Sequence, residues 1–241
     1  MKIIIADAKS LKVKHNQIIG QKPLFTTKSK PLFKVLTKLT PNEIHDLMKI
    51  SFKQSSLIYD YYHNEELYPA LNLYDGVVFK QLEIETYEND DYRYLEDHLL
   101  IMSPLYGILR YNDEINFHRL EMKHHLNKLN LYDYWSNEVN SYLKNEDMII
   151  SLSTGEYEKL IDHPNLIRID FGIISGDKIK RNAVYLKQAR GKMLNYLVKH
   201  HLTTIEQIKN IVIDGYCFNE QLSTNHNLVF LKPEIMTYKK L

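Results

Sequence analysis

The sequence contains a single cysteine, Cys217, among its 241 residues. One thiol excludes an internal disulfide, a multi-cysteine metal site and dithiol redox chemistry. Its surroundings are typical of a half-buried strand, with a reactive thiol as the open alternative. The histidines His118, His124-His125 and His200-His201 also lack the spacing to each other and to a carboxylate that metal sites show. We therefore expect no metal and no cofactor.

Long hydrophobic runs are absent as well, and none approaches the roughly 20 residues that a membrane-spanning helix needs. The short apolar run Met1–Ala6 is followed by lysines, which indicates a first buried strand rather than a signal peptide. We therefore expect a cytoplasmic protein. Glycine and proline are scarce, and no linker, low-complexity tract or repeat divides the chain. We therefore expect a single domain over residues 1–241.

Charge is distributed unevenly although the formal net charge is only +1. Residues 1–40 hold nine lysines and one acid, Asp7, and residues 178–199 hold seven basic residues and no acid. If these segments meet in space, they form a positive cleft suited to a polyanion or a phosphorylated molecule. The alternative is that the lysines only keep surface loops soluble.

Periodicity and capping patterns predict alternating helices and strands. A capping box at Thr40-Pro41-Asn42-Glu43 opens a helix that carries apolar residues to Ile58, and another helix runs from Asp90 or Asp91 through Ile101. The remaining expected elements are a helix over 131–143, a strand over 148–152, a hairpin over 166–186, a helix over 191–202, a short helix after 203, and strands near 216–218 and 228–231. This order favours an α+β or mixed α/β fold in which helices surround a mixed sheet.

The segment Lys187–Met193 crowds three basic residues at an expected helix start. Unpaired N–H groups and the helix dipole make a helix start positive, so cations there are unfavourable unless an anion binds. We therefore predict that Lys187, Arg190, Gly191 and Lys192 form an anion site. A solvated helix face is the alternative.

Eight sequence blocks, spread almost from end to end, resemble the YaaA family of peroxide stress proteins. The blocks are Ala8–Leu11, Tyr74–Val77, Ser103–Arg110, Arg119–Met122, Leu131–Trp135, Gly155–Tyr157, Lys187–Met193 and Gly215-Tyr216. The resemblance implies a compact α/β body with a positively charged cleft and a helix-hairpin-helix-like element. It further implies a bacterial cytosolic protein that responds to hydrogen peroxide, is associated with lowered free iron, and binds DNA.

Two positions depart from the pattern of that family. Asp7 stands in a block that usually reads Ser-Pro-Ala-Lys-Thr-Leu, and Pro104 replaces the usual glycine of the tyrosine-glycine block. Asp7 places a negative charge beside Lys9, which opposes anion binding there.

Further candidate residues follow from their chemistry and position. A turn after a helix is expected to present Arg110 as a bidentate donor to a carboxylate or phosphate. Arg119 and Glu121 are two residues apart, so on a strand they share a face and form an ion pair. Glu156 and Tyr157 follow a buried strand, where open α/β sheets hold reactive groups. We therefore take Glu121, Glu156 and Tyr157 as candidate catalytic residues, with structural roles as the alternative.

An αα-hairpin is predicted where the helix ending at His200-His201 turns through residues 202–204 into a second helix. Such hairpins bind nucleic-acid phosphates through backbone N–H groups without reading bases. Residues 40–64 are an alternative location.

Two functions therefore remain open. The first is a stress-response protein that binds DNA without sequence specificity, has no stable protein partner, and limits damage by free iron and hydrogen peroxide. The second is an enzyme whose residues Lys9, Arg110, Arg119, Lys187 and Arg190 grip a phosphorylated or carboxylated small molecule. Residues at element ends favour a pocket. The absence of a nucleophile or nucleotide motif favours the first function.

Overall fold

The computed structural model describes residues 1–234, which are built around one mixed sheet of eight strands. Five parallel neighbours stand in the order β3-β1-β6-β7-β10, while β4, β8 and β9 pair antiparallel to β3, β7 and β10. The strands are β1 (Lys2–Ala6), β3 (Leu99–Ser103), β4 (Gly107–Leu109), β6 (Ile149–Ser151), β7 (Leu166–Ser175), β8 (Lys178–Lys180), β9 (Cys217–Phe218) and β10 (Asn227–Pro233). A separate sheet pairs β2 (Leu67–Pro69) with β5 (Glu114–Asn116). The predicted mixed sheet is confirmed.

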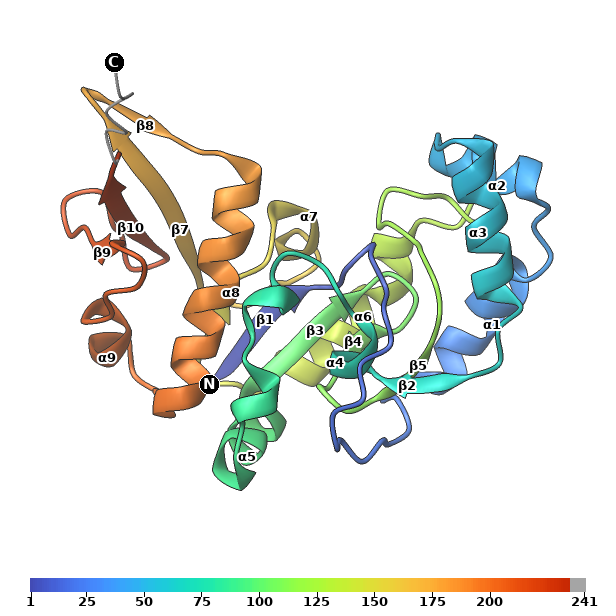
Figure 1. Cartoon of the computed structure of the whole chain (residues 1–241), viewed down its shortest axis with the longest axis horizontal. Coiled ribbons are helices and arrows are strands. Elements are labelled where there is room, and N and C mark those ends of the chain that lie inside the picture. Colours follow the sequence, from blue (N-terminus) through green and yellow to red (C-terminus); the bar gives the residue numbers. More distant parts are fainter. Residues whose placement is uncertain (235–241) are drawn as a thin grey trace, which may run out of the picture.

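Helices pack around this sheet, and Figure 1 shows α1, α2 and α3 at the end of the molecule opposite to β8, β9 and β10. The helices are α1 (Thr26–Leu36), α2 (Pro41–Met48), α3 (Phe52–Tyr62), α4 (Ala70–Leu73), α5 (Asn89–His98), α6 (Leu131–Leu143), α7 (Gly155–Glu158), α8 (Ala183–His200), α9 (Ile205–Lys209) and two 3-10 turns, η1 (Phe79–Gln81) and η2 (Ile84–Thr86). Within residues 1–234, no helix combines the length and the apolar character needed to cross a bilayer.

The centre of the sheet is apolar and is buried on both of its faces. All five residues of β3 and the three central residues of β1 are buried. Parallel strands covered in this way read as continuous apolar runs rather than as alternating ones. This is why the run at Met1–Ala6 correctly predicts a strand.

Several predicted boundaries are wrong for local reasons. The helix that opens at Thr40 ends at Met48, because Lys49 adopts a left-handed conformation with φ of 53°, and Ser51 then caps a new helix, α3. Helix α5 ends at His98, and the apolar residues after it pair with β1 as β3. Pairing with the sheet overrides the helical periodicity that connects Leu95 with Leu99. Cys217 lies on a strand as expected but is exposed rather than half-buried.

Helix α8 corrects the prediction for the basic segment. It begins at Ala183, where the Asn182 side chain accepts hydrogen bonds from the N–H groups of Val184 and Tyr185. Lys187 to Met193 therefore lie in the interior of an 18-residue helix, where backbone N–H groups are already bonded. The predicted helix start at this segment is wrong, and the helix dipole gives no reason for an anion there.

The chain order places a crevice between β1 and β6. The strand that follows β1 in the main sheet is β3, on one side of β1, whereas the strand that follows β6 is β7, on the other side. The connections therefore leave the carboxyl ends of these two neighbours in opposite directions. Such a switch point is the usual location of ligand sites in open α/β sheets.

Candidate functional site

A cavity of about 360 Å³ lies at the carboxyl ends of β1 and β6, as the switch point predicts. Residues just after β1 and β6 form two of its walls, and the loop before η1, a loop near residue 120 and the middle of α8 form the others. Its charged or phenolic lining residues are Asp7, Lys9, Glu121, Glu156, Tyr157, Lys187 and Arg190. We call it the edge cavity.

Asp7 and Tyr157 form a hydrogen-bonded polar pair of the edge cavity, in which Tyr157 is buried and Asp7 is half-buried. The Tyr157 hydroxyl donates a 2.5 Å hydrogen bond to Oδ1 of Asp7. Burial, together with the negative charges of Glu156 and Glu121, raises the pKa of Asp7 to about 7, although the Tyr157 hydrogen bond and the charge of Lys9 oppose this rise. Burial and the charge of Asp7 raise the pKa of Tyr157 well above its usual value. Asp7 is therefore a carboxyl group that gains and loses a proton near neutral pH.

Glu121 has the opposite electrostatic environment. Its carboxylate lies 2.7 Å from Lys9 Nζ, 3.1 Å from Lys123 Nζ and 3.8 Å from Arg119 Nη2. Burial acts to raise the pKa of Glu121, but the hydrogen bonds and charges of Lys9 and Lys123 outweigh it and lower the pKa to about 2. The predicted Arg119–Glu121 ion pair is present, but it lies in a loop rather than on a strand. Glu121 is thus a fixed anion that neutralises Lys9, not a proton carrier at neutral pH.

A second pair of titratable side chains, Tyr74 and His118, lies near Asp7. Tyr74 and His118 are both buried, and the Tyr74 hydroxyl lies 3.3 Å from His118 Nε2. Nδ1 of His118 lies 2.8 Å from the Asn116 carbonyl, so Nδ1 carries the hydrogen and Nε2 accepts from Tyr74. Burial lowers the pKa of His118 to about 4, which keeps the ring neutral, and burial and the charge of Asp7 raise the pKa of Tyr74.

Helix α8 supplies the basic wall of the cavity through Lys187 and Arg190, which are three residues apart on one face. Lys187 is exposed, whereas Nε of Arg190 is buried and has no hydrogen-bond partner within residues 1–234. Burial lowers the pKa of Arg190, and the charges of Asp170 and Glu158 oppose that shift. A buried guanidinium N–H without a partner is unfavourable, so its position beside a cavity points to an anionic ligand.

Two glycines, Gly76 and Gly191, allow close packing of the loop before η1, which forms one wall of the cavity. A Cβ at Gly76 would lie 2.8 Å from the Cβ of Ala8, and a Cβ at Gly191 would lie 2.3 Å from the carbonyl oxygen of Val78. The loop is therefore packed closely between the segment after β1 and the interior of α8. Gly191 lines no part of the edge cavity; its place in the structure is this contact.

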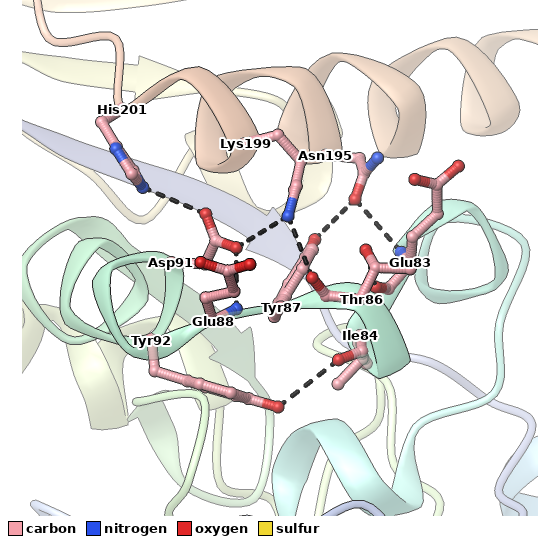
Figure 2. Close-up of polar contacts among 10 residues, drawn as sticks. All are labelled: Glu83, Ile84, Thr86, Tyr87, Glu88, Asp91, Tyr92, Asn195, Lys199 and His201. Atoms are coloured by element: carbon pink, nitrogen blue, oxygen red, sulfur yellow. Dashed lines mark hydrogen bonds and ion pairs between the residues drawn. The ribbon is translucent and has the colours of Figure 1, made fainter.

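Helix α8 is itself fixed to α5 by a polar network (Figure 2). The buried carboxylate of Asp91 accepts from Lys199 Nζ at 2.9 Å and lies 3.0 Å from Nε2 of His201. Oδ1 of Asn195 accepts from the Tyr87 hydroxyl at 2.7 Å and from the Glu83 N–H at 3.1 Å. These contacts connect the C-terminal half of α8 to α5 and to the segment that precedes α5.

The other predicted basic residues lie elsewhere. Arg110 follows β4 rather than a helix, and its Nε and Nη2 both donate to Oδ1 of the buried Asp113, at 2.9 and 2.7 Å. Lys192 lies 3.2 Å from Asp214 and lines no part of the edge cavity. Most other cations of 178–199 are also paired: Lys180 with Glu234, Arg181 with Asp170, and Lys199 with Asp91. The two basic segments meet at the cavity only through Lys9, Lys187 and Arg190.

Asp7 is a cavity residue that the sequence did not single out as a candidate acid or base, because its charge was considered only for its effect on anion binding at Lys9. The rule that selected Glu156 and Tyr157 after β6 also applies to Asp7, which directly follows the buried strand β1. The buried pair of Tyr74 and His118 had no such signal, because their contact joins residues 44 positions apart.

The fold and the cavity define an open α/β protein with a polar site at the carboxyl edge of its sheet. The chain belongs to the YaaA family of peroxide stress proteins, whose family model, described as peroxide stress protein YaaA, matches residues 1–222. Similar proteins include the UPF0246 proteins of Fusobacterium nucleatum (34% identical, 96% of this chain and 99% of the relative) and Finegoldia magna (34%, 96% and 98%). The resemblance drawn from the sequence blocks is confirmed.

Proposed function

We propose that this peroxide stress protein binds a small phosphorylated or carboxylated molecule in the edge cavity and transfers a proton to or from it. The observation that carries the proposal is the juxtaposition of Asp7, with a pKa of about 7, and the basic pair Lys187 and Arg190 across one cavity. A general acid or base works best when its pKa lies near the ambient pH. Perturbed titratable groups in a cavity are typical of active sites.

Each residue then has a separate task. Arg190 and Lys187 hold the anionic group, because a guanidinium and an ammonium on one helix face can bind it together. Asp7 gains or loses the proton, and the hydroxyl of Tyr157 orients its carboxyl group. Glu121 keeps Lys9 in place by the 2.7 Å ion pair and remains charged throughout. Glu156, which also lines the cavity, raises the pKa of Asp7 through its negative charge.

Calorimetric titration with pyrophosphate and with citrate tests the binding half of the proposal. We expect Arg190→Ala to weaken binding of the preferred anion by about 10- to 100-fold, because a charge-assisted pair is lost. Lys192→Ala is the matched control, since Lys192 is a lysine of the same helix that lies outside the cavity. Equal affinity of the two variants, or no binding of either anion to the wild-type protein, contradicts the proposal.

Survival under hydrogen peroxide tests the biological half. The test complements cells that lack this protein with either wild type or Asp7→Asn. We expect wild type to limit damage from peroxide and free iron. We expect Asp7→Asn to give no protection, although it is folded and still binds the anion. Protection by Asp7→Asn equal to that by wild type contradicts proton transfer at Asp7.

DNA binding is the second candidate function, and the α8–α9 hairpin is the observation that favours it. His201 ends α8 in a left-handed conformation, and Thr204 begins the five-residue helix α9 with a capping box, so two helices follow each other through a short turn where the αα-hairpin is predicted. The acid-free segment 178–199 leads into this hairpin. Against it, many of the basic residues there are paired with carboxylates.

Fluorescence anisotropy of a labelled duplex at several salt concentrations separates the two candidates. If DNA lies across the cavity mouth, a Lys187→Ala, Arg190→Ala double variant loses affinity and shows a shallower salt slope. Absence of binding by wild type, or binding that is indifferent to both substitutions, removes this second candidate and leaves the small-molecule site.

A further inference from the structure

A second cavity, of about 450 Å³, lies beside α1 and has no part in the site described above. Positions 26, 29, 30, 33, 34 and 37 of the α1 segment line it, a spacing that forms one continuous helical face. The opposite wall consists of residues from β2, β5 and the turn between β3 and β4. We call it the α1 cavity.

The floor of the α1 cavity is apolar and is hydrogen-bonded to β5. Leu105 and Tyr106 are buried, and Phe33 is partly buried beside them. The Tyr106 hydroxyl accepts a 3.1 Å hydrogen bond from the Asn116 N–H, which ties this floor to β5. Leu67, in contrast, lines the cavity with 49% of its surface exposed to solvent. An apolar surface of this kind is available to the body of a small ligand.

The rim of the α1 cavity carries three lysines, Lys22, Lys30 and Lys34, and one acid, Glu114. Within residues 1–234, none of these lysines forms a salt bridge, although Lys28 of the same helix pairs with Glu138 at 2.6 Å. Lys30 and Lys34 are four residues apart on one helix face, where like charges repel each other. An anion held between them removes this repulsion.

We propose that the α1 cavity binds a small amphipathic organic anion, with one carboxylate, sulfonate or phosphate head group between Lys30 and Lys34 and an apolar body over Phe33 and Leu67. The cavity volume lies within the range of small-molecule sites. Three cations against one acid select an anionic ligand. The apolar floor selects a ligand with a hydrocarbon or aromatic body over inorganic phosphate. This site is independent of the function proposed for the edge cavity.

Titration of the whole protein with the fluorescent probe anilinonaphthalene sulfonate, followed by displacement with decanoate, tests the proposal. We expect the double variant Lys30→Glu, Lys34→Glu to weaken probe binding by at least about tenfold. The control Lys12→Glu, Lys38→Glu makes the same change in net charge at exposed lysines outside the cavity, and we expect less than about a twofold change.

Two further measurements test the head group and the body separately. Decanol, which shares the chain of decanoate but lacks its charge, is expected to displace the probe at least about tenfold less effectively. Leu67→Gln, at a position with 49% of its surface exposed, is expected to weaken probe binding by about three- to tenfold in a variant whose folding is checked by thermal melting. The proposal is overturned if wild type does not bind the probe, or if neither the charge-reversal variant nor the Leu67 variant changes probe binding. It is also overturned if decanol displaces the probe as well as decanoate does.

Discussion

The two cavities of this protein use similar residue types in different ways. At the edge cavity, acids and bases line one enclosed space, with a 2.7 Å contact between Lys9 and Glu121; burial raises the pKa of Asp7, and the neighbouring lysines lower the pKa of Glu121. At the α1 cavity, exposed lysines that have no carboxylate partner among residues 1–234 surround an apolar floor. Buried, paired groups are suited to proton transfer, whereas exposed cations over apolar surface are suited to binding alone.

The largest expected effect on stability comes from a substitution in the wall of the edge cavity, which leaves the α1 cavity unchanged. Gly191→Val places a side chain against the carbonyl oxygen of Val78, which lies 2.3 Å from an added Cβ. We expect a loss of about 2–4 kcal/mol in the free energy of unfolding, from overpacking and the displaced loop. Urea unfolding measures the loss, and pyrophosphate titration reports the site.

The control for this variant is Gly155→Ala, since a Cβ at Gly155 meets no atom within 4 Å. It is expected to change the free energy of unfolding by less than about 1 kcal/mol. Unchanged anion binding in folded Gly191→Val shows that the loop does not shape the edge cavity.

Asp7→Asn tests the edge cavity through the pH dependence of the free energy of unfolding. A carboxyl whose pKa rises from 3.8 to about 7 on folding holds a proton that the unfolded chain has lost, so wild type loses stability as pH rises from about 4 to about 7. The Asn variant lacks this dependence and is expected to be more stable than wild type by about 1–3 kcal/mol at pH 8. Unfolding by urea at a series of pH values measures it. A wild type and a variant with parallel pH profiles contradict the assignment.

Glu121→Gln tests the fixed anion in the opposite pH range. The pKa of Glu121 is lowered to about 2, so its stabilising contribution is complete above about 4.5 and is lost as pH falls toward 2. We expect a cost of about 1–2 kcal/mol at pH 7, reduced by the exposure of Lys9 and Lys123. Thermal melts between pH 7 and pH 3 are expected to show wild type approaching the variant; a constant difference contradicts the ion-pair account.

The smallest effect on stability is expected at the α1 cavity. Lys30→Glu replaces a repulsive pair with a favourable Glu–Lys pair at i and i+4. We expect a gain of about 0.2–0.5 kcal/mol in the free energy of unfolding, together with weaker binding of anilinonaphthalene sulfonate. Paired unfolding and probe titrations measure both. A variant that is less stable and binds the probe as wild type does shows that Lys30 has a structural role only.

The sequence predicted those parts of the fold that depend on local patterns. The capping box at Thr40, the helix over 131–143 and the first strand are confirmed because caps and apolar runs act over a few residues. The start of α8 was misplaced by eight residues, because Asn182 caps a helix that begins at Ala183 rather than at Gly191. The basic residues of that segment were therefore assigned to a helix end that does not exist.

The edge cavity was predictable in part. Glu156, Tyr157, Lys187 and Arg190 reach it because strand ends and a helix face converge at the switch point. The pairing of Arg110 with Asp113 depends on a tight turn, which the sequence signal alone did not distinguish from a ligand contact. The α1 cavity had no sequence signal beyond the excess of lysine in residues 1–40, because its opposite wall comes from residues 67–116.

The most direct test of the central claim is a pH titration of the side-chain carboxyl carbons by ¹³C NMR, in wild type and in Asp7→Asn. We expect one aspartate resonance with a midpoint near pH 7 in wild type that is missing from the variant spectrum. If every aspartate of wild type titrates below about pH 5, Asp7 is an ordinary carboxylate. The edge cavity then lacks the proton-transfer group on which the proposed function rests.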